Sequence, residues 1–279
     1  VGSEMCIRDS NDFCDYCQIL SSVFYKDLLN YTKEHEINKL FIISDSTMGF
    51  FSPNLVSYND FWLIKNVKSI NNIIDYNVIN IETNNSIYND VIIGKSFGKD
   101  SDRAIHLTCE WLNEKNKTDF IGITNLTDDI KELTNICDEK VPKFLILFAH
   151  GIMDANSNLQ DGAVAIQGNN KTIKMEYILN KCNSFQNLIL ISCRGGKSFI
   201  NQIESNSCIW SNILEQPIHN IILCRWDVPV KSTLEILDSI IKYITEEKYD
   251  LSEALIKAQV EASYKYDFHE WAGLEFWNN

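Results

Sequence analysis

The sequence predicts an α/β fold with a mostly parallel sheet flanked by helices, and three observations lead to that prediction. Short runs of consecutive aliphatic residues alternate along the chain with amphipathic segments of helical length. The runs at residues 144–149 and 188–191 are too short for helices and are typical of strands buried on both faces. Each of these two runs ends in a reactive side chain that glycine follows within two residues. Parallel strands joined by right-handed crossovers account for all three features.

Length and composition limit the class of protein. The 279 residues can form one large domain or two smaller ones, and the net charge of −13 argues against nucleic acid or an anionic membrane as the main partner. No apolar run approaches the roughly 18 residues that a membrane span needs. The nine cysteines have no framework spacing, and no secretory signal is present. We therefore expect a cytoplasmic protein with reduced thiols.

The first 38 residues precede the predicted sheet and divide into two parts. Residues 1–10, VGSEMCIRDS, resemble translated sequencing-adapter read-through, so we set them aside as non-native and expect the natural protein to extend further upstream. Residues 11–38 are predicted to be a helical lead-in capped by Asn11 or Asp12. Cys14 and Cys17 lack a second pair of metal ligands, which favours helix packing over zinc binding. The apolar positions of this helix recur every three or four residues: Phe13, Cys17, Leu20, Phe24, Leu28 and Tyr31.

The next segment, residues 39–117, alternates between strand and helix patterns. We predict strands at residues 39–44 and 91–93 and a helix at 102–115 with Ile105, Cys109 and Leu112 on one face. Between them lies an irregular, Asn-rich region that reaches about Asn89. It contains short strand-like pieces at residues 61–64 and 78–81.

The remaining residues, 118–279, carry most of the predicted elements. The predicted strands are 120–123, 144–149, 163–167, 172–173, 188–191, 220–224 and an edge strand at 271–277. The predicted helices are 126–137, 175–181, 207–215, 230–247 and 250–264. The helix at 230–247 has an apolar stripe of Leu234, Leu237, Ile241 and Ile244, and Asp250 with Glu253 forms a capping box for the last helix.

His150 and Cys193 are the residues predicted to carry chemistry. Each ends a buried strand, and the two are 43 positions apart. Because ligands bind beyond the carboxyl ends of parallel strands, both side chains are expected at one crevice. A nearby imidazolium lowers the pKa of a thiol and can protonate a leaving amine, which is the chemistry of a cysteine peptidase. The alternative, that Cys193 is a buried cysteine and His150 a histidine with a structural role, stays open.

Two backbone donors complete the predicted peptidase site, and one motif elsewhere in the sequence offers a competing prediction. The N–H groups of Gly151 and Cys193 are expected to receive the oxyanion. Gly94-Lys-Ser96-Phe-Gly98 fits the nucleophile elbow of serine hydrolases, with Asp227 and His269 following in the right order. However, the elbow requires a helix to begin at the serine, and the residues after Gly98 delay that helix.

Several pieces of the sequence together resemble the CHAT domain family of caspase-like cysteine peptidases, related to caspases and separase and often joined to TPR repeats. The resemblance implies a caspase-like sheet, a degenerate N-terminal lobe at residues 39–117 and a catalytic lobe at 118–279, with His150 and Cys193 as the dyad. The pieces that carry it begin with Lys39-Leu-Phe-Ile-Ile-Ser-Asp45, Val91-Ile-Ile-Gly94 and Leu147-Phe-Ala-His-Gly151. They continue with Leu188-Ile-Leu-Ile-Ser-Cys193, Arg225-Trp-Asp-Val228, Leu251-Ser-Glu-Ala-Leu-Ile-Lys-Ala258 and Trp271-Ala-Gly-Leu274.

The resemblance also implies the substrate-binding residues Asp227, Trp226 and Arg194. Family members carry further acidic residues after this tryptophan, whereas here Val228-Pro-Val-Lys231 follows, so a preference for a basic P1 residue is not carried over. Asp227 either lines the S1 pocket or caps the helix at 230–247. A proline that precedes the final tryptophan motif in the family is replaced by Asp267-Phe-His-Glu270.

The function predicted from all this is limited cleavage of a protein substrate by a cytoplasmic cysteine endopeptidase that needs no cofactor or metal. The resemblance implies a regulatory module or TPR repeats, upstream or in trans, and a role in bacterial antiviral defence. A catalytically silent CHAT-like scaffold is the first alternative, and a serine hydrolase that uses Ser96 is the second.

Overall fold

A computed structural model gives the fold of the protein over the described part of the chain. Predictions that fall on other residues lie outside the described part of the chain, including the strand at 78–81, the helices at 126–137, 175–181 and 207–215, and the Cys14/Cys17 pair. The described residues are 18–19, 21–23, 25–43, 53–58, 61–73, 91–96, 103–115, 121–125, 144–149, 166–168, 171–173, 187–192, 219–224, 226 and 228–278.

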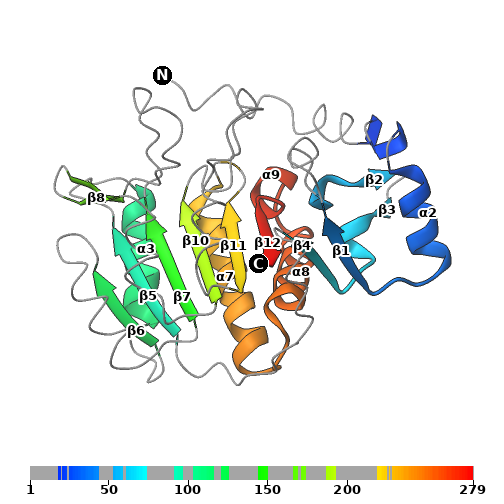
Figure 1. Ribbon diagram of the computed structural model, residues 1–279. Helices are drawn as coiled ribbons and strands as arrows, with labels where there is room; N and C mark the ends of the chain where they lie inside the picture. Colours follow the sequence, from blue (N-terminus) through cyan, green and yellow to red (C-terminus); the bar gives the residue numbers. More distant parts are fainter. Residues whose placement is uncertain are drawn as a thin grey trace.

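The centre of the molecule is an eight-stranded sheet (Figure 1). Two short antiparallel pairs lie outside it, β2 (Ser57–Tyr58) with β3 (Phe61–Trp62) and β8 (Ile166–Gly168) with β9 (Lys171–Ile173). In spatial order the strands of the main sheet are β1 (Lys39–Ile43), β4 (Ser69–Ile73), β12 (Leu274–Asn278), β11 (Asn220–Cys224), β10 (Asn187–Ser192), β7 (Phe144–Ala149), β5 (Val91–Ser96) and β6 (Ile121–Asn125).

All neighbouring strands of this sheet but one pair run parallel, as the sequence predicts. The strands from β11 to β6 are mutually parallel, and so are β12, β4 and β1. The two sets meet at the antiparallel pair β11–β12. The strands of the segment 39–117 and those of 118–279 therefore share one sheet, and the boundary at residue 117 stays a prediction.

Three helices cover one face of the sheet, behind it in Figure 1. Trp111 of α3 packs edge-on against Phe148 of β7, at 5.6 Å between ring centroids, and its Nε1 donates to Asp238 of α7 at 2.8 Å. The hydroxyl of Ser252 on α8 donates to the carbonyl of Ile70 on β4 at 3.2 Å. The helices of the described chain are α2 (Lys26–Glu34), α3 (Arg103–Lys115), α7 (Val230–Thr245), α8 (Leu251–Ala262) and α9 (Phe268–Trp271), with the 3-10 turns η1 (Pro53–Leu55) and η2 (Leu63–Lys65).

The strongest sequence patterns correspond to the best-defined elements. The aliphatic strands β7, β10 and β11 are almost fully buried, as expected for strands covered on both faces. All four residues of the predicted stripe on α7 are buried. Asp250 caps α8 by accepting a 2.8 Å hydrogen bond from the N–H of Glu253.

The prediction of an irregular region between residues 44 and 90 is wrong for β4. This strand, Ser-Ile-Asn-Asn-Ile, lies inside the sheet between β1 and β12. Asparagine disfavours strands in isolation. Here Asn72 is buried and its Nδ2 donates to the carbonyl of Phe276 at 2.8 Å, so tertiary hydrogen bonding outweighs the local preference.

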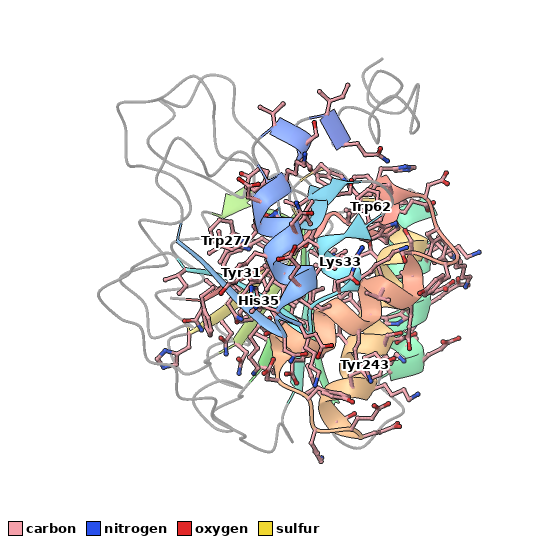
Figure 2. The ribbon with its side chains drawn as sticks, turned by 90° about the vertical axis from the view of Figure 1, so that its right-hand side faces the viewer. Tyr31, Lys33, His35, Trp62, Tyr243 and Trp277 are labelled. Atoms are coloured by element: carbon pink, nitrogen blue, oxygen red, sulfur yellow. The ribbon has the colours of Figure 1, made fainter. Side chains whose placement is uncertain are left out.

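Two further expectations are corrected by the packing. The C-terminal strand β12 is not an edge strand, because β4 and β1 continue the sheet beyond it. On α2 the buried side chains are Leu29 and Thr32, whereas Tyr31, placed on the apolar stripe by its spacing, is 56% exposed (Figure 2). The face of α2 that packs against the core is thus rotated from the face that the sequence pattern indicates.

Candidate functional site

The carboxyl ends of three neighbouring strands coincide at one edge of the sheet. The register pairs Ser96 of β5 with Ala149 of β7, and Ala149 with Ser192 of β10, and these are the last residues of their strands. In parallel sheets this edge is where ligands bind. The structure therefore provides the strand arrangement that the predicted site requires.

The residues predicted for chemistry follow these strand ends in the sequence. His150 comes directly after Ala149, and Cys193 directly after Ser192. Both residues lie outside the described part of the chain, as do three other predicted site residues: Gly151, Arg194 and Asp227. Their roles stay predictions.

Trp226 is the one predicted site residue whose surroundings the structure describes. It follows β11, the strand on the far side of β10 from β7, and it is half-buried. Its Nε1–H donates to the backbone carbonyl of His269 at 2.8 Å. The indole is therefore anchored to α9, which Figure 1 shows at the end of the sheet toward which β10 and β11 point.

The indole of Trp226 belongs to a cluster of four aromatic rings, which we call the aromatic cluster: Trp62, Trp226, Phe268 and Trp271. Phe268 lies at its centre, with ring centroids 6.2 Å from Trp226, 5.2 Å from Trp62 and 5.1 Å from Trp271. Trp62, labelled in Figure 2, comes from β3 and also contacts Trp271 at 5.9 Å. Tilted and edge-on arrangements like these are favourable for aromatic pairs.

No sequence pattern indicates the residues that surround Trp226. The sequence offers His269 only as the third member of the Ser96, Asp227 and His269 order, whereas its backbone carbonyl accepts the hydrogen bond from the indole. Gly273 was not singled out, although a Cβ there would lie 2.3 Å from Cγ1 of Val228 and 3.0 Å from Nε1 of Trp226. The matching piece Trp271-Ala-Gly-Leu274 pointed to this turn without indicating what it contacts.

Two alternatives from the sequence can be compared with the described elements. Ser96 is the last residue of β5, and the next described helix, α3, begins at Arg103. Residues 97–102 lie outside the described part of the chain, so the nucleophile elbow at Ser96 stays a prediction. The N-cap position of α7 is occupied by Pro229 rather than Asp227, whose side chain also lies outside the described residues.

The carboxylate of Glu235, on α7, pairs with Lys265 in the segment before α9. Although burial opposes it, the hydrogen bond and the positive charge of Lys265 hold the pKa of Glu235 below its ordinary value. Burial raises the pKa of Tyr266, and the Glu235 carboxylate adds to that rise. Both effects keep the Glu235 side chain ionised and the phenol neutral near pH 7.

The described residues contain no group of three or more His, Cys, Asp or Glu side chains that is arranged to hold a metal ion. Within the same residues no helix combines the length and the apolar character needed to cross a membrane.

Comparisons with known proteins agree with this fold. A family model described as CHAT domain matches residues 15–276. No curated protein sequence matches the chain. A chain in the complex of the pro- and mature domains of RgpB from Porphyromonas gingivalis is similar in structure, with 12% identity and a TM-score of 0.56 over 96% of this chain and 75% of that one.

A second solved structure is similar over a smaller part of its own length. It is a chain in the separase–securin complex of Saccharomyces cerevisiae, with 12% identity and a TM-score of 0.58. The match covers 85% of the present chain and only 15% of that chain. At this level of identity the two likenesses show the fold alone, and they confirm the predicted caspase-like architecture.

Proposed function

The chain belongs to the CHAT domain family, and from that membership we propose that it is a cysteine endopeptidase with Cys193 as nucleophile and His150 as acid and base. The register of β7 and β10 carries the proposal. It pairs Ala149 with Ser192, the residues that directly precede His150 and Cys193 in the chain. A thiol and an imidazole that directly follow the paired ends of two neighbouring parallel strands suit one catalytic unit.

The reaction proceeds in two halves. The Cys193 thiolate attacks the carbonyl carbon of the scissile peptide bond while the His150 imidazolium donates its proton to the leaving amine, so that the C–N bond breaks and a thioester forms. The neutral imidazole then takes a proton from water. The resulting hydroxide attacks the thioester, which releases the acid and restores the thiolate and the imidazolium.

The remaining predicted residues serve binding. The N–H groups of Gly151 and Cys193 stabilise the negative oxygen of the tetrahedral intermediate. Trp226, Asp227 and Arg194 contact the substrate beside the scissile bond. The described position of Trp226, after the strand next to β10, supports its part in this set.

The wider role follows from the family resemblance. We expect a cytoplasmic protease whose activity a partner protein controls, through TPR repeats or another module, and a place in bacterial antiviral defence. The separase chain that the fold matches is found in a complex with securin, which supports control by a bound protein.

The test measures whether Cys193 and His150 act as one unit. Alkylation of Cys193 by iodoacetamide is followed against pH in the wild type and in His150→Ala, by mass spectrometry of the peptide that carries it. The proposal predicts that wild-type alkylation titrates well below the free-thiol pKa of about 8.5 and that His150→Ala returns it to that value. Cys109, half-buried on α3, reports in the same samples and its profile is expected not to change.

Cleavage gives the second measurement. Cys193→Ala and His150→Ala each abolish peptidase activity, and the double variant is no worse than either, because residues that act as a unit have non-additive effects. Identical alkylation profiles near pH 8.5 in both proteins, together with no cleavage when the partner is bound, contradict the proposal and favour a silent scaffold.

A further inference from the structure

Two buried side-chain amides from opposite ends of the chain converge on the turn between α9 and β12. Nδ2 of Asn54, on η1, donates to the carbonyls of Ala272 at 3.1 Å and Leu274 at 2.8 Å. Nε2 of Gln259, on α8, donates to the carbonyls of Trp271 at 2.9 Å and Leu274 at 2.8 Å. We call this arrangement of Asn54 and Gln259 on residues 271–274 the amide clamp.

The clamp holds its turn in one conformation. Asn54 is 4% exposed and Gln259 is fully buried, so the carbonyls they bind have little access to water. The nitrogen of each amide donates to two carbonyls of the same turn. Removing such a donor is costly, because it leaves buried carbonyls without a hydrogen bond. The main chain from Trp271 to Leu274 is thereby tied to η1 on one side and to α8 on the other.

The turn that the amide clamp fixes lies against the side chain of Trp226. Gly273 lies so close to the segment after β11 that an added Cβ would be 2.3 Å from Cγ1 of Val228 and 3.0 Å from Nε1 of Trp226. The carbonyl of His269, at the start of the same unit, accepts the indole N–H at 2.8 Å. The position of the indole thus requires glycine at 273, and a hydrogen bond to the backbone of α9 holds its nitrogen.

The register relates Trp226 to the proposed catalytic residues. Leu147, Leu190 and Leu223 form one row across β7, β10 and β11. His150, Cys193 and Trp226 each come three positions after their member of this row. Since β10 lies between the other two strands, Trp226 follows the strand on the opposite side of β10 from the one that precedes His150.

We propose that the amide clamp and Gly273 position Trp226 as an apolar wall of the peptidase site, where it contacts an apolar or aromatic side chain of the substrate. The indole N–H is engaged with His269, so the exposed part of this half-buried ring offers carbon surface rather than a hydrogen bond. Asn54, Gln259 and Gly273 act through Trp226 and are positioning residues. This inference rests on the proposed function, because it places the wall beside Cys193.

The experiment compares two alkylating reagents at Cys193 in the full chain. The measured quantity is the rate with N-phenylmaleimide divided by the rate with iodoacetamide, on the peptide that carries Cys193, with N-acetylcysteine as the reference thiol. An aromatic wall raises this ratio about tenfold above the reference, the effect of one favourable ring contact. We expect Trp226→Ala to return the ratio to the reference value, and Asn54→Ala to lower it at least about threefold.

Asn72→Ala is the matched control. Asn72 is also a buried asparagine, and it lies on β4, a neighbour of β12 in the sheet. Its Nδ2 donates to the β12 carbonyl of Phe276 at 2.8 Å, away from the turn. It loses a bond of the same kind, so its melting temperature falls as in Asn54→Ala, while its reagent ratio stays at the wild-type value. If Asn54→Ala does not fold, Gly273→Ala replaces it, because its Cβ would lie 2.3 Å from Cγ1 of Val228 and 3.0 Å from Nε1 of Trp226 and would push the segment that carries both residues.

Three results overturn the inference: a wild-type ratio equal to that of N-acetylcysteine, an unchanged ratio in the clamp variant, or an equal fall in Asn72→Ala. The pH profile of iodoacetamide alkylation is recorded on the same proteins. A low thiol pKa that depends on His150, combined with a reference-level ratio, rejects the wall while the peptidase proposal stands. An elevated ratio with a free-thiol profile rejects the peptidase proposal and leaves Trp226 as the wall of a binding site.

Discussion

The strands on one side of the β11–β12 junction differ from those on the other in what covers them and in what sets their positions. From β11 to β5 the strands are rich in aliphatic side chains, and those whose side chains the structure describes are buried on both faces. On the other side, the amides of Asn71 and Asn72 on β4 donate to backbone carbonyls of the neighbouring strands, those of Leu40 on β1 and Phe276 on β12. We call these the aliphatic half and the amide-bound half of the sheet.

The difference shows two ways of placing a strand. In the aliphatic half, the energy of burial is large but weakly directional, because any similar side chain contributes about as much. In the amide-bound half, each hydrogen bond requires one donor at one position, so a few polar side chains select a single arrangement. The proposed dyad follows strands of the aliphatic half, and the turn that holds Trp226 belongs to the amide-bound half.

The largest effect is expected for a truncation in the aliphatic half. Ile189, in β10, has no exposed surface, and Ile189→Ala should lower the free energy of unfolding by about 2–5 kcal/mol because it removes buried carbons and leaves a cavity. Urea denaturation measures the change. Ile19→Ala is the matched control, since Ile19 is 61% exposed, and it should change stability by less than about 0.5 kcal/mol. Equal losses in the two variants would contradict the role assigned to this half.

A smaller loss is expected when the amide clamp is broken. Gln259→Met keeps the volume but removes the donor to the carbonyls of Trp271 and Leu274, at a cost of about 1–3 kcal/mol. Oε1 of Gln259 has no partner among the described residues, so removing that oxygen offsets part of the loss. Lys257→Met on the same helix is the control, because the half-exposed Lys257 loses an ion pair with Glu247 and a hydrogen bond to Tyr249 that are worth less than the buried bonds of Gln259. A Gln259→Met protein as stable as Lys257→Met would show that apolar packing alone holds this half.

The junction between the halves contains a row of three asparagines. Nδ2 of Asn220 donates to Oδ1 of Asn187 at 2.8 Å, and Oδ1 of Asn220 accepts from Asn278 at 2.9 Å. Asn220→Ala removes both bonds and should cost about 1 kcal/mol. Asn66→Ala, which removes an exposed hydrogen bond to Trp62, should cost less. Equal melting temperatures for the two variants would mean that the row does not stabilise the junction.

The smallest effect is expected outside the sheet, at the exposed pair of Glu235 and Lys265. The pKa of Glu235 is lowered in the folded protein, so the pair stabilises it above the unfolded pKa of about 4.3 and ceases to do so as the pH falls through the folded value. The difference in melting temperature between wild type and Glu235→Gln should be small at pH 7 and should shrink further as the pH falls through the lowered pKa of Glu235. A difference that grows on acidification would contradict this sign.

The sequence predicted the aliphatic half far better than the amide-bound half. Consecutive aliphatic residues identify β7, β10 and β11 without knowledge of their neighbouring strands, because short runs of this kind are typical of strands whose two faces are both buried. By contrast, β4 was assigned to an irregular region and β12 to an edge. Asparagines lower the strand preference of β4, and only the carbonyl of Phe276, more than 200 residues away, gives Asn72 its partner.

For the site, the sequence identified Trp226 from its motif but none of the residues that hold it. Asn54 and Gln259 are ordinary polar residues in their local sequence, and no periodicity distinguishes them. Asn54 donates to a carbonyl 220 positions further along the chain. Gln259, on α8, donates to the carbonyl of Leu274 at the turn after α9. Gly273 could be noticed as a glycine near a tryptophan, yet its close approach to Val228 is a property of the folded chain.

By itself, the sequence determined the fold class, the parallel order of the aliphatic strands, the amphipathic helix α7 and the adjacency in sequence of His150 and Cys193 to two strand ends. These follow from burial and periodicity, which act over a few neighbouring residues. The tertiary structure alone decided that β12 lies inside the sheet, that β4 pairs with it, and that the turn at Gly273 meets Trp226. Those features depend on directional hydrogen bonds and steric contacts between distant segments, and no local pattern encodes such partners.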